Sequence, residues 1–332
     1  MQPYDDRSGS IRVLVTGAGG PAGIAVMKSL SSVPSVEVLA ADMDAWAAGL
    51  YLVPAQNRVI VPAGDAGDFV PALIGICERL SVDVVVPTVD AELMPLALSR
   101  DDFARRGVAL MLAPDKALAQ TLDKLALARV CADAVRVPRT ESLDTPADPA
   151  SWTYPVIVKP RSGSGSRGVS MPQSAAELAA IGARPGYLVQ EYLPGDEYSV
   201  DVLADGGGRV AAAVPRLRAR VDSGVSVAGR TVRNPELENF GAAVATAVGL
   251  TYIGNVQCRR DRAGRLALLE VNPRPPGSMP LTIASGVDMP RLALEALRGG
   301  ELPAHAGFTE TAMVRFLDER FVTMAEVERV SA

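Results

Sequence analysis

The segment LLEVNPR at Leu268–Arg274 decides how the rest of the chain is interpreted. Glu270 and Asn272 are two residues apart on a predicted strand, so their side chains share one face of it. The neighbouring predicted strand, Gly254–Arg260, carries Gln257 and pairs with the first in antiparallel fashion. Three oxygen-bearing side chains amid apolar neighbours are costly to bury without a hard cation. The pattern therefore predicts a magnesium site, which manganese could also occupy.

Arg274 follows the same strand and is expected to point the same way as Asn272. A guanidinium there would stabilise negative charge on a phosphoryl group during its transfer. The alternative for this pair of strands is an edge hairpin with a polar outer face. The flanking Leu268, Leu269 and Val271 argue against a fully exposed face.

A glycine- and serine-rich loop, Ser162–Gly168, follows a short apolar strand that ends at Lys159. A fixed ammonium beside mobile backbone amides suits the phosphates of a nucleotide. Arg161 and Arg167 would add positive charge. The loop is not of the Walker type, because its lysine precedes the glycines. The alternative is a flexible linker after an edge strand.

The segment QEYLPGDEYSVD at Gln190–Asp201 begins at the end of an apolar strand and continues through a Pro-Gly turn. A strand that runs into a turn can present its backbone to the edge of an adenine ring. Glu197, which follows the turn, is placed to bind ribose hydroxyls. The alternative is a hairpin with solvated acids.

A second glycine cluster, Thr16–Gly23, has the pattern T-G-x-x-G-x-x-G between a predicted strand and a helix. Such glycines let backbone amides approach an anion, and Asp42 lies where a dinucleotide site would place an acid for ribose. An NAD(P)-dependent enzyme of the short-chain dehydrogenase type is therefore an alternative. Those enzymes need a Tyr-x-x-x-Lys pair, and no tyrosine here has a lysine four residues on. The simpler interpretation is a tight turn that packs strand against helix.

Two acids follow the fourth predicted strand, in the segment TVDAE at Thr88–Glu92. Ligands of open parallel sheets bind beyond the carboxyl ends of the strands. Asp90 and Glu92 are therefore candidates for binding the amine group of a substrate. The alternative for Asp90 is to cap the following helix.

The order of predicted elements divides the chain into two parts. In residues 1–113, buried strands alternate with helices, which predicts an α/β domain with a parallel, doubly wound sheet. Residues 114–332 have an α+β pattern, with one subdomain at 113–187 and another at 188–332. Uninterrupted helical patterns occupy Asp68–Leu80, Ala91–Arg106 and Asp115–Ala134.

Composition excludes several classes of function. The chain has 332 residues, is 48% hydrophobic, and has no apolar run long enough to predict a membrane span. Its net charge of −5 comes without a clustered basic segment, which argues against nucleic-acid binding. Three widely spaced cysteines predict a reducing, cytoplasmic compartment. The polar segment 1–10 is expected to be a disordered lead-in rather than a secretion signal.

Taken together, the motifs resemble those of the ATP-grasp superfamily, most closely its carbamoyl-phosphate-synthetase-like branch of single-copy ligases. The resemblance covers nearly the whole chain and rests on the order and spacing of the pieces. They are VLVTGAGGPAG, the pair Asp123-Lys124, IVKP, GSGSRGV, VQEYLPGDEYSVDVLAD, NVQ and LEVNPRPPG. It implies a pre-ATP-grasp domain at residues 1–113, followed by a two-subdomain α+β ATP-grasp fold.

The resemblance also implies roles for individual residues. Nucleotide phosphates would contact Lys124, Lys159 and the loop residues Ser162, Gly163, Ser164, Gly165, Ser166 and Gly168. Gln190, Glu191 and Leu193 would bind adenine, and Glu197 the ribose. Gln257, Glu270 and Asn272 would hold magnesium. Arg274 would act on the transferring phosphoryl group, and Arg218, with the loop Val221–Arg230 after it, would reach the acyl phosphate.

The implied reaction is an ADP-forming ligation of a carboxylate to an amine through an acyl phosphate, with ATP and Mg²⁺ and with small-molecule substrates. A homodimer is compatible with the resemblance, and a non-catalytic nucleotide-binding module is a further alternative. After NPR the family usually continues with Phe-Ser-Gly, whereas this chain has Pro275-Pro276-Gly277-Ser278. That region borders the acceptor, so Gly277 and Ser278 are candidate substrate residues.

Overall fold

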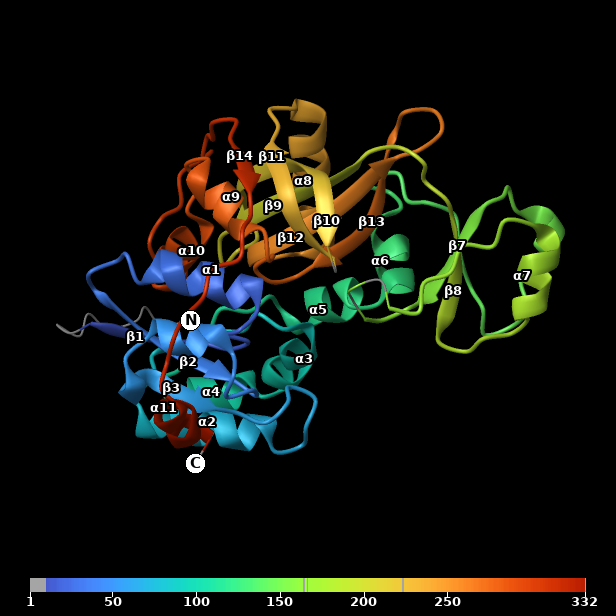
Figure 1. Ribbon diagram of the computed structural model, residues 1–332. Coiled ribbons are helices and arrows are strands. Elements are labelled where there is room, and N and C mark those ends of the chain that lie inside the picture. The colour runs from blue at the N-terminus through green and yellow to red at the C-terminus, as the bar shows by residue number, and fades with distance from the viewer. Residues whose placement is uncertain (1–9, 164, 166, 223, 332) are drawn as a thin grey trace.

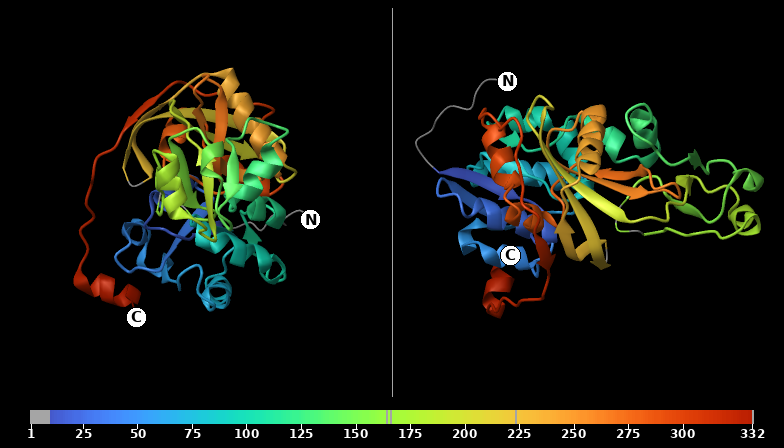
Figure 2. Two further views of the ribbon diagram at one scale, coloured as in Figure 1. Left: turned by 90° about the vertical axis from the view of Figure 1, so that its right-hand side faces the viewer. Right: turned by 90° about the horizontal axis from the view of Figure 1, so that it is seen from above.

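The computed structural model describes residues 10–163, 165, 167–222 and 224–331. The expected disordered lead-in therefore lies outside the described residues, apart from Ser10. Three sheets form two units: a large body, which contains the five-stranded and six-stranded sheets, and a small lobe that extends from one side of it (Figures 1 and 2).

The first sheet is parallel and has the strand order β3-β2-β1-β4-β5. This confirms the predicted α/β class of the N-terminal part. Its strands are β1 (Ile11–Val15), β2 (Val36–Asp42), β3 (Arg58–Ile60), β4 (Val84–Val86) and β5 (Ala109–Leu110). Its helices are α1 (Pro21–Leu30), α2 (Phe69–Arg79), α3 (Asp90–Leu98) and α4 (Arg100–Ala104). The strand order reverses between β1 and β4, so the loops after these two strands lie side by side.

The small lobe is a three-stranded antiparallel sheet with the order β6-β8-β7. Its elements are β6 (Thr140–Ser142), β7 (Val156–Pro160), α7 (Ala175–Ile181) and β8 (Tyr187–Glu191). Helices α5 (Asp115–Thr121) and α6 (Lys124–Cys131) connect it to the first sheet along the chain. The division expected between residues 187 and 188 falls inside β8.

The largest sheet has six strands in the order β13-β12-β9-β10-β11-β14, all antiparallel. They are β9 (Glu197–Ala204), β10 (Val210–Asp222), β11 (Val225–Thr231), β12 (Tyr252–Arg260), β13 (Leu266–Asn272) and β14 (Ala312–Val314). Helices α8 (Pro235–Val248), α9 (Met279–Ala284) and α10 (Met289–Leu297) pack against it, while α11 (Met324–Ser331) packs against β3 of the first sheet. None of the helices in the described ranges is long and apolar enough to cross a lipid bilayer.

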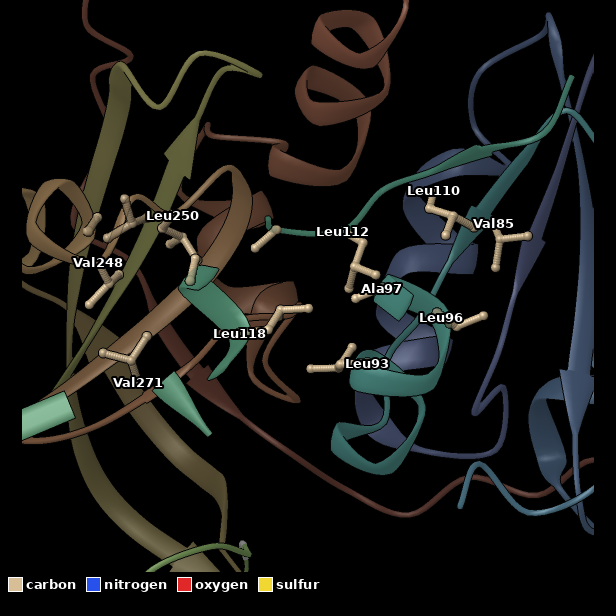
Figure 3. Packing of buried hydrophobic residues seen from close by; sticks show 14 of the residues in the cluster. Val85, Leu93, Leu96, Ala97, Leu110, Leu112, Leu118, Val248, Leu250 and Val271 are labelled. Atoms are coloured by element: carbon tan, nitrogen blue, oxygen red, sulfur yellow. The ribbon is translucent and has the colours of Figure 1, made fainter. Parts of the chain in front are cut away.

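The body has a hydrophobic interior that is continuous across its two sheets. One cluster joins Val85 and Leu93 of the first sheet region to Leu118 of α5 and to Val271 of β13 (Figure 3). The small lobe has a separate core of six buried residues, Leu143, Trp152, Val156, Val158, Leu178 and Val189. The lobe is therefore the part of the fold that is least tied to the rest by apolar packing.

Two of the expected helices are interrupted, and one expected loop is a hairpin. Ala91–Arg106 is divided at Ser99, where α3 ends and α4 begins. Asp115–Ala134 is divided because the Asp123 carboxylate accepts hydrogen bonds from the first backbone amides of α6, which starts a new helix. The segment Val221–Arg230 is not a loop, because most of it forms the end of β10 and nearly all of β11.

Candidate active site

A cavity of about 350 Å³ lies between the small lobe and the six-stranded sheet. Its walls come from β7, the loop after it, the end of β8, and strands β9, β10, β12 and β13. Most of the expected nucleotide residues line it, together with two of the expected metal ligands, Gln257 and Glu270. The nucleotide residues are Lys124, Lys159, Ser162, Gly163, Gly165, Gln190, Glu191, Leu193 and Glu197. Gly168 does not line it, and Ser164 and Ser166 lie outside the described residues.

Lys159 and Glu270 face this cavity, and neither has a hydrogen-bond or ion-pair partner among the described residues. Lys159 is only 9% exposed, and within the described ranges its ammonium makes no hydrogen bond or ion pair. Burial lowers the pKa of Lys159 to about 8, the Glu270 carboxylate opposes this shift, and the Lys124 ammonium adds to it. The Glu270 carboxylate lies on the opposite wall of the cavity. Among the described residues, no group donates a hydrogen bond to it.

The start of α6 brings a second lysine to the cavity. Lys124 follows the capping residue Asp123, and its ammonium donates to the carbonyl of Gly163 at 2.7 Å. Arg161 was expected to add charge to the phosphate region, but it lies outside the lining and binds the Asp123 carboxylate at 2.5 Å. Its role is therefore to fix the residue that starts α6. Arg167 does line the cavity.

The end of β8, which was expected to face adenine, carries two side chains that bind neighbouring residues of the protein. Gln190 donates to the hydroxyl of Thr140 at 2.9 Å, and Glu191 accepts from Arg136 at 2.6 Å. Gln190 is buried, whereas the Glu191 side chain is 34% exposed, and β8 ends at Glu191. The carboxylate of Glu197 accepts a short hydrogen bond from Arg218. Leu193 is buried and lines the cavity, where its side chain adds an apolar surface.

The expected metal ligands lie next to one another. Gln257 pairs directly with Glu270 across β12 and β13, and Asn255 pairs with Asn272. The oxygen of Gln257 accepts from Arg218 at 3.2 Å, while its amide nitrogen donates to Asn255 at 3.4 Å. The described residues contain no cluster of three His, Cys, Asp or Glu side chains. One carboxylate and two amide oxygens are nevertheless a donor set that suits a hard cation completed by phosphate and water.

A second cavity of about 200 Å³ adjoins the first. The two share Gly165, Arg218, Gly224, Gln257 and Glu270. The second cavity is lined by the expected metal ligand Asn272, by Arg274, expected at the transferring phosphoryl group, and by the expected substrate residues Gly277 and Ser278. The structure therefore brings the candidate nucleotide, metal and acceptor residues into one continuous site.

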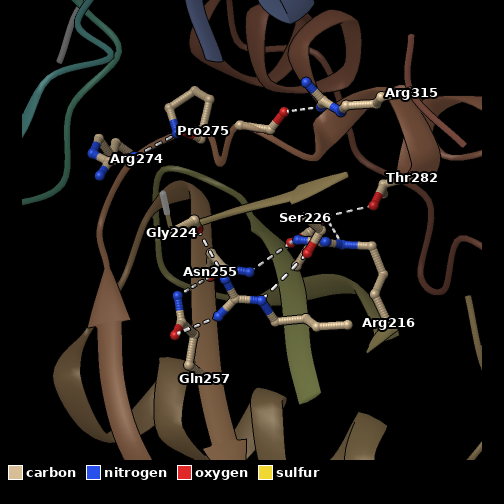
Figure 4. Close-up of polar contacts among 12 residues, drawn as sticks. Arg216, Gly224, Ser226, Asn255, Gln257, Arg274, Pro275, Thr282 and Arg315 are labelled. Carbon is tan, nitrogen blue, oxygen red and sulfur yellow. Dashed lines mark hydrogen bonds and ion pairs between the residues drawn. The ribbon is translucent and has the colours of Figure 1, made fainter. Parts of the chain in front are cut away.

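A buried ion pair beneath the second cavity was not found from the sequence. Arg216 binds Asp201 through two hydrogen bonds of 2.8 and 2.6 Å, and Asp201 is fully buried. The amide of Asn255 donates to Asp201 at 2.7 Å, and the hydroxyl of Thr282 donates to it as well (Figure 4). The signal was present as alternation, because Arg216 and Arg218 share one face of β10.

The acids expected to bind an amine have other partners. Asp90 does not cap α3; instead its carboxylate binds Arg274. The carboxylate of Glu92 lines neither cavity, because it turns inward and accepts a short hydrogen bond from the Thr16 hydroxyl. Burial raises the pKa of Glu92 to about 7.

Close packing explains the N-terminal glycine cluster. A Cβ atom on Gly17 would lie 2.4 Å from a methyl group of Val89, and one on Gly23 would lie 2.4 Å from the carbonyl oxygen of Gly17. The Asp42 carboxylate accepts a hydrogen bond from the backbone N–H of Gly19 at 2.8 Å, and this contact stabilises the loop. These contacts favour the packing turn over a dinucleotide site.

Comparisons with known proteins agree with this geometry. Residues 183–319 match the family model described as ATP-grasp in the biosynthetic pathway with Ter operon, and residues 13–111 match the PylC-like N-terminal domain. The C-terminal part of the chain is thus similar to ATP-grasp proteins, and the N-terminal part to PylC-like proteins. Neither match is to a nicotinamide-dependent dehydrogenase. No curated protein matches this chain in sequence.

Solved structures show the same ATP-grasp architecture at low sequence identity. A biotin carboxylase complex from Campylobacter jejuni is 17% identical with a TM-score of 0.74, over 89% of this chain and 72% of the other. N5-carboxyaminoimidazole synthetase from Staphylococcus aureus with ADP is 16% identical with a TM-score of 0.74, over 95% and 84%. The biotin carboxylase domain dimer of Hydrogenobacter thermophilus 2-oxoglutarate carboxylase, with MgADP and bicarbonate, is 16% identical with a TM-score of 0.71, over 88% and 70%.

Proposed function

We propose that this ATP-grasp protein is an ADP-forming ligase that joins a small carboxylate, such as an amino acid, to an amine or related nucleophile through an acyl phosphate. The observation that carries the proposal is the pair Lys159 and Glu270, which face one cavity as charges without a hydrogen-bond partner among the described residues. Leaving a buried charge such as the Lys159 ammonium unpaired is costly. A nucleotide triphosphate with a divalent cation would give both Lys159 and Glu270 a partner.

The lobe side of the cavity would hold the nucleotide. Lys124 and Lys159 would bind phosphate oxygens, and the amides of Ser162–Gly168 would close over them. The backbone beyond β8 and the apolar side chain of Leu193 would hold adenine, with Glu197 at the ribose. Binding across the gap would bring the small lobe and the six-stranded sheet together, which excludes water from the transferring phosphoryl group.

A divalent ion, Mg²⁺ or Mn²⁺, would be held by Gln257, Glu270 and Asn272. When bound, it neutralises phosphate charge and orients the terminal phosphoryl group. Among the described residues no group donates to either carboxylate oxygen of Glu270, whereas Gln257 would have to turn its oxygen away from Arg218. The Hydrogenobacter carboxylase domain, which has a similar fold, was solved in complex with MgADP, and this supports magnesium as the ion.

The second cavity would take the carboxylate substrate. Its oxygen attacks the terminal phosphorus of ATP, ADP leaves, and the nucleophile then displaces phosphate from the acyl phosphate. Arg218 and Arg274 would stabilise the charge of the transferring group, and Gly277 and Ser278 would border the acceptor. No side chain needs to form a covalent intermediate, so positioning supplies the catalysis. We also propose a homodimer, in the manner of the Hydrogenobacter domain.

The test is ADP release from Mg-ATP with a panel of amino acids. The Glu270→Ala variant should abolish it, while Glu295→Ala, an exposed acid on α10, should not. Substantial turnover by Glu270→Ala at saturating magnesium would contradict the metal site. Thermal unfolding with Mg-ATP and with NAD separates the alternatives: Mg-ATP stabilisation without ADP release indicates a non-catalytic module, and stabilisation by NAD alone would overturn the proposal.

A further inference from the structure

The residue that binds the Arg274 side chain lies in the N-terminal domain. It follows β13, yet its guanidinium binds the carboxylate of Asp90, the first residue of α3 in the N-terminal domain. Two nearly parallel contacts join them, Nε to Oδ1 at 2.6 Å and Nη2 to Oδ2 at 2.8 Å. Bidentate pairs of this kind fix the plane of a guanidinium as well as its position.

Asp90 binds one edge of the Arg274 guanidinium, and a second edge can still donate hydrogen bonds. Asp90 occupies the edge formed by Nε and Nη2, and Nη1 makes one long contact of 3.3 Å with the carbonyl of Pro275. The edge formed by Nη1 and Nη2 keeps N–H groups for another acceptor. Arg274 lines the second cavity, whereas Asp90 does not. The carboxylate therefore lies behind the arginine with respect to the cavity.

Arg216 repeats this arrangement on another wall. Its Nε and Nη2 bind the two oxygens of Asp201, and its Nη1 makes no hydrogen bond with any described residue. The Asp201 carboxylate is fully buried, and Arg216 lines the second cavity. Two guanidinium groups, each held from behind by an acid, thus present their outer edges to the same small space.

The Asp90 side chain makes no other contact that would explain its position, as far as the described residues show. The cap position of α3 is Val89, and in the described part of the chain the Asp90 side chain has no partner except Arg274. An acid that does not cap its helix, lies outside the cavity and binds only a cavity arginine is suited to orient that arginine.

We propose that Asp90 is a positioning residue, which aims the outer edge of Arg274 at an anionic oxygen in the second cavity. The inference rests on the proposed ligase function. It also gives the N-terminal domain a part in the site, because that domain supplies the group that orients a residue of the other domain. The anionic oxygen belongs either to the acceptor carboxylate or to the transferring phosphoryl group.

Asp90→Asn is the decisive variant, because it keeps the size of the side chain but loses the charge and one acceptor. ADP release should be measured with the best amino acid from the panel, and kcat/KM should fall about tenfold to hundredfold. A rise in KM for the amino acid places the anion on the acceptor, and a fall in kcat places it on the phosphoryl group. Equal kinetic constants for Asp90→Asn and wild type would overturn the proposal.

A double-mutant cycle separates positioning from general damage. If Asp90 acts only through Arg274, Asp90→Asn should have little further effect in an Arg274→Gln background; full additivity would overturn the proposal. Asp90→Glu should restore part of the activity. The control is Glu326→Gln, which removes another ion pair between the N-terminal domain and the end of the chain, at 3.4 Å from Arg58, and should leave kcat/KM unchanged.

A binding measurement keeps the inference separate from the ligase proposal. Inorganic phosphate should stabilise the wild-type protein against heat in the presence of MgADP, and the concentration needed should rise about tenfold in Asp90→Asn. No ADP release by the wild type would sink the ligase function while this result still stood. An equal response of wild type and variant, both to phosphate and to the best amino acid of the panel, would count against the positioning role.

Discussion

The two glycine-rich loops of this chain look alike in sequence and differ in what their glycines do. Both follow a buried strand, β1 in one case and β7 in the other. In the first, at Thr16–Gly23, added methyl groups would strike backbone and side chains. In the second, Gly163 and Gly165 have open space around their Cβ positions and φ angles of 102° and 71°. Glycine serves packing in one loop and backbone freedom beside a cavity in the other.

The residues beneath the loops sharpen the contrast. Glu92 lies under the first loop and is bonded to Thr16, whereas Lys159 ends the strand before the second and has no partner among the described residues. Burial moves the pKa of both toward neutrality, to about 7 for Glu92 and to about 8 for Lys159. A satisfied buried group belongs to the architecture, and an unsatisfied one that faces a cavity points to a ligand.

The largest effect should come from Lys159→Met, which removes the unpartnered charge but keeps most of the apolar stem. The Kd for Mg-ATP, or kcat/KM for ATP, should worsen about a hundredfold, because a partly desolvated ammonium–phosphate contact is lost. Isothermal titration calorimetry or ADP release measures it. Lys116→Met, at an exposed lysine of α5, is the control. A loss of less than about threefold would mean that Lys159 does not bind phosphate.

The next effect concerns Glu92 and depends on pH. Its folded pKa of about 7 lies above the ordinary value of 4.5, so stability that is full below pH 4.5 is lost as pH rises to about 7. Glu92→Gln lacks this loss. In urea unfolding, the variant should gain on the wild type by about 3 kcal/mol between pH 4.5 and pH 8. Parallel pH profiles for the two proteins would refute the raised pKa.

The smallest effect compares one glycine from each loop. Gly23→Ala should lower the free energy of unfolding by about 2 kcal/mol, because its Cβ would meet backbone atoms that cannot move aside. Gly165→Ala should cost about 1 kcal/mol or less, the strain of its positive φ, and should instead raise the KM for ATP. Urea unfolding and steady-state kinetics together distinguish the two. Equal stability losses would remove the difference between the loops.

The sequence predicted the strands and the family better than it predicted local breaks and partners. Period-two alternation gave the positions of Gln257, Glu270 and Asn272 on paired strands, because a strand fixes its own side-chain direction. The break at Asp123 was missed because helical periodicity continues across it, although its capping carboxylate was visible. The pair Asp90–Arg274 joins residues that are distant along the chain, and no local pattern encodes that contact. For the pair Arg216–Asp201, alternation along β10 gave the direction of Arg216 but not its partner on β9.

The small core of the lobe has a consequence for how the molecule opens. Six buried residues hold the lobe together, whereas the body shares clusters that cross both of its sheets. The free energy of local unfolding should therefore be lowest in β6, β7 and β8. Their amides should exchange with deuterium earlier than those of β9 and β12 in the free protein. A ligand that bridges Lys159 and Glu270 would slow that exchange, and the protection of these strands would report how long the site stays closed.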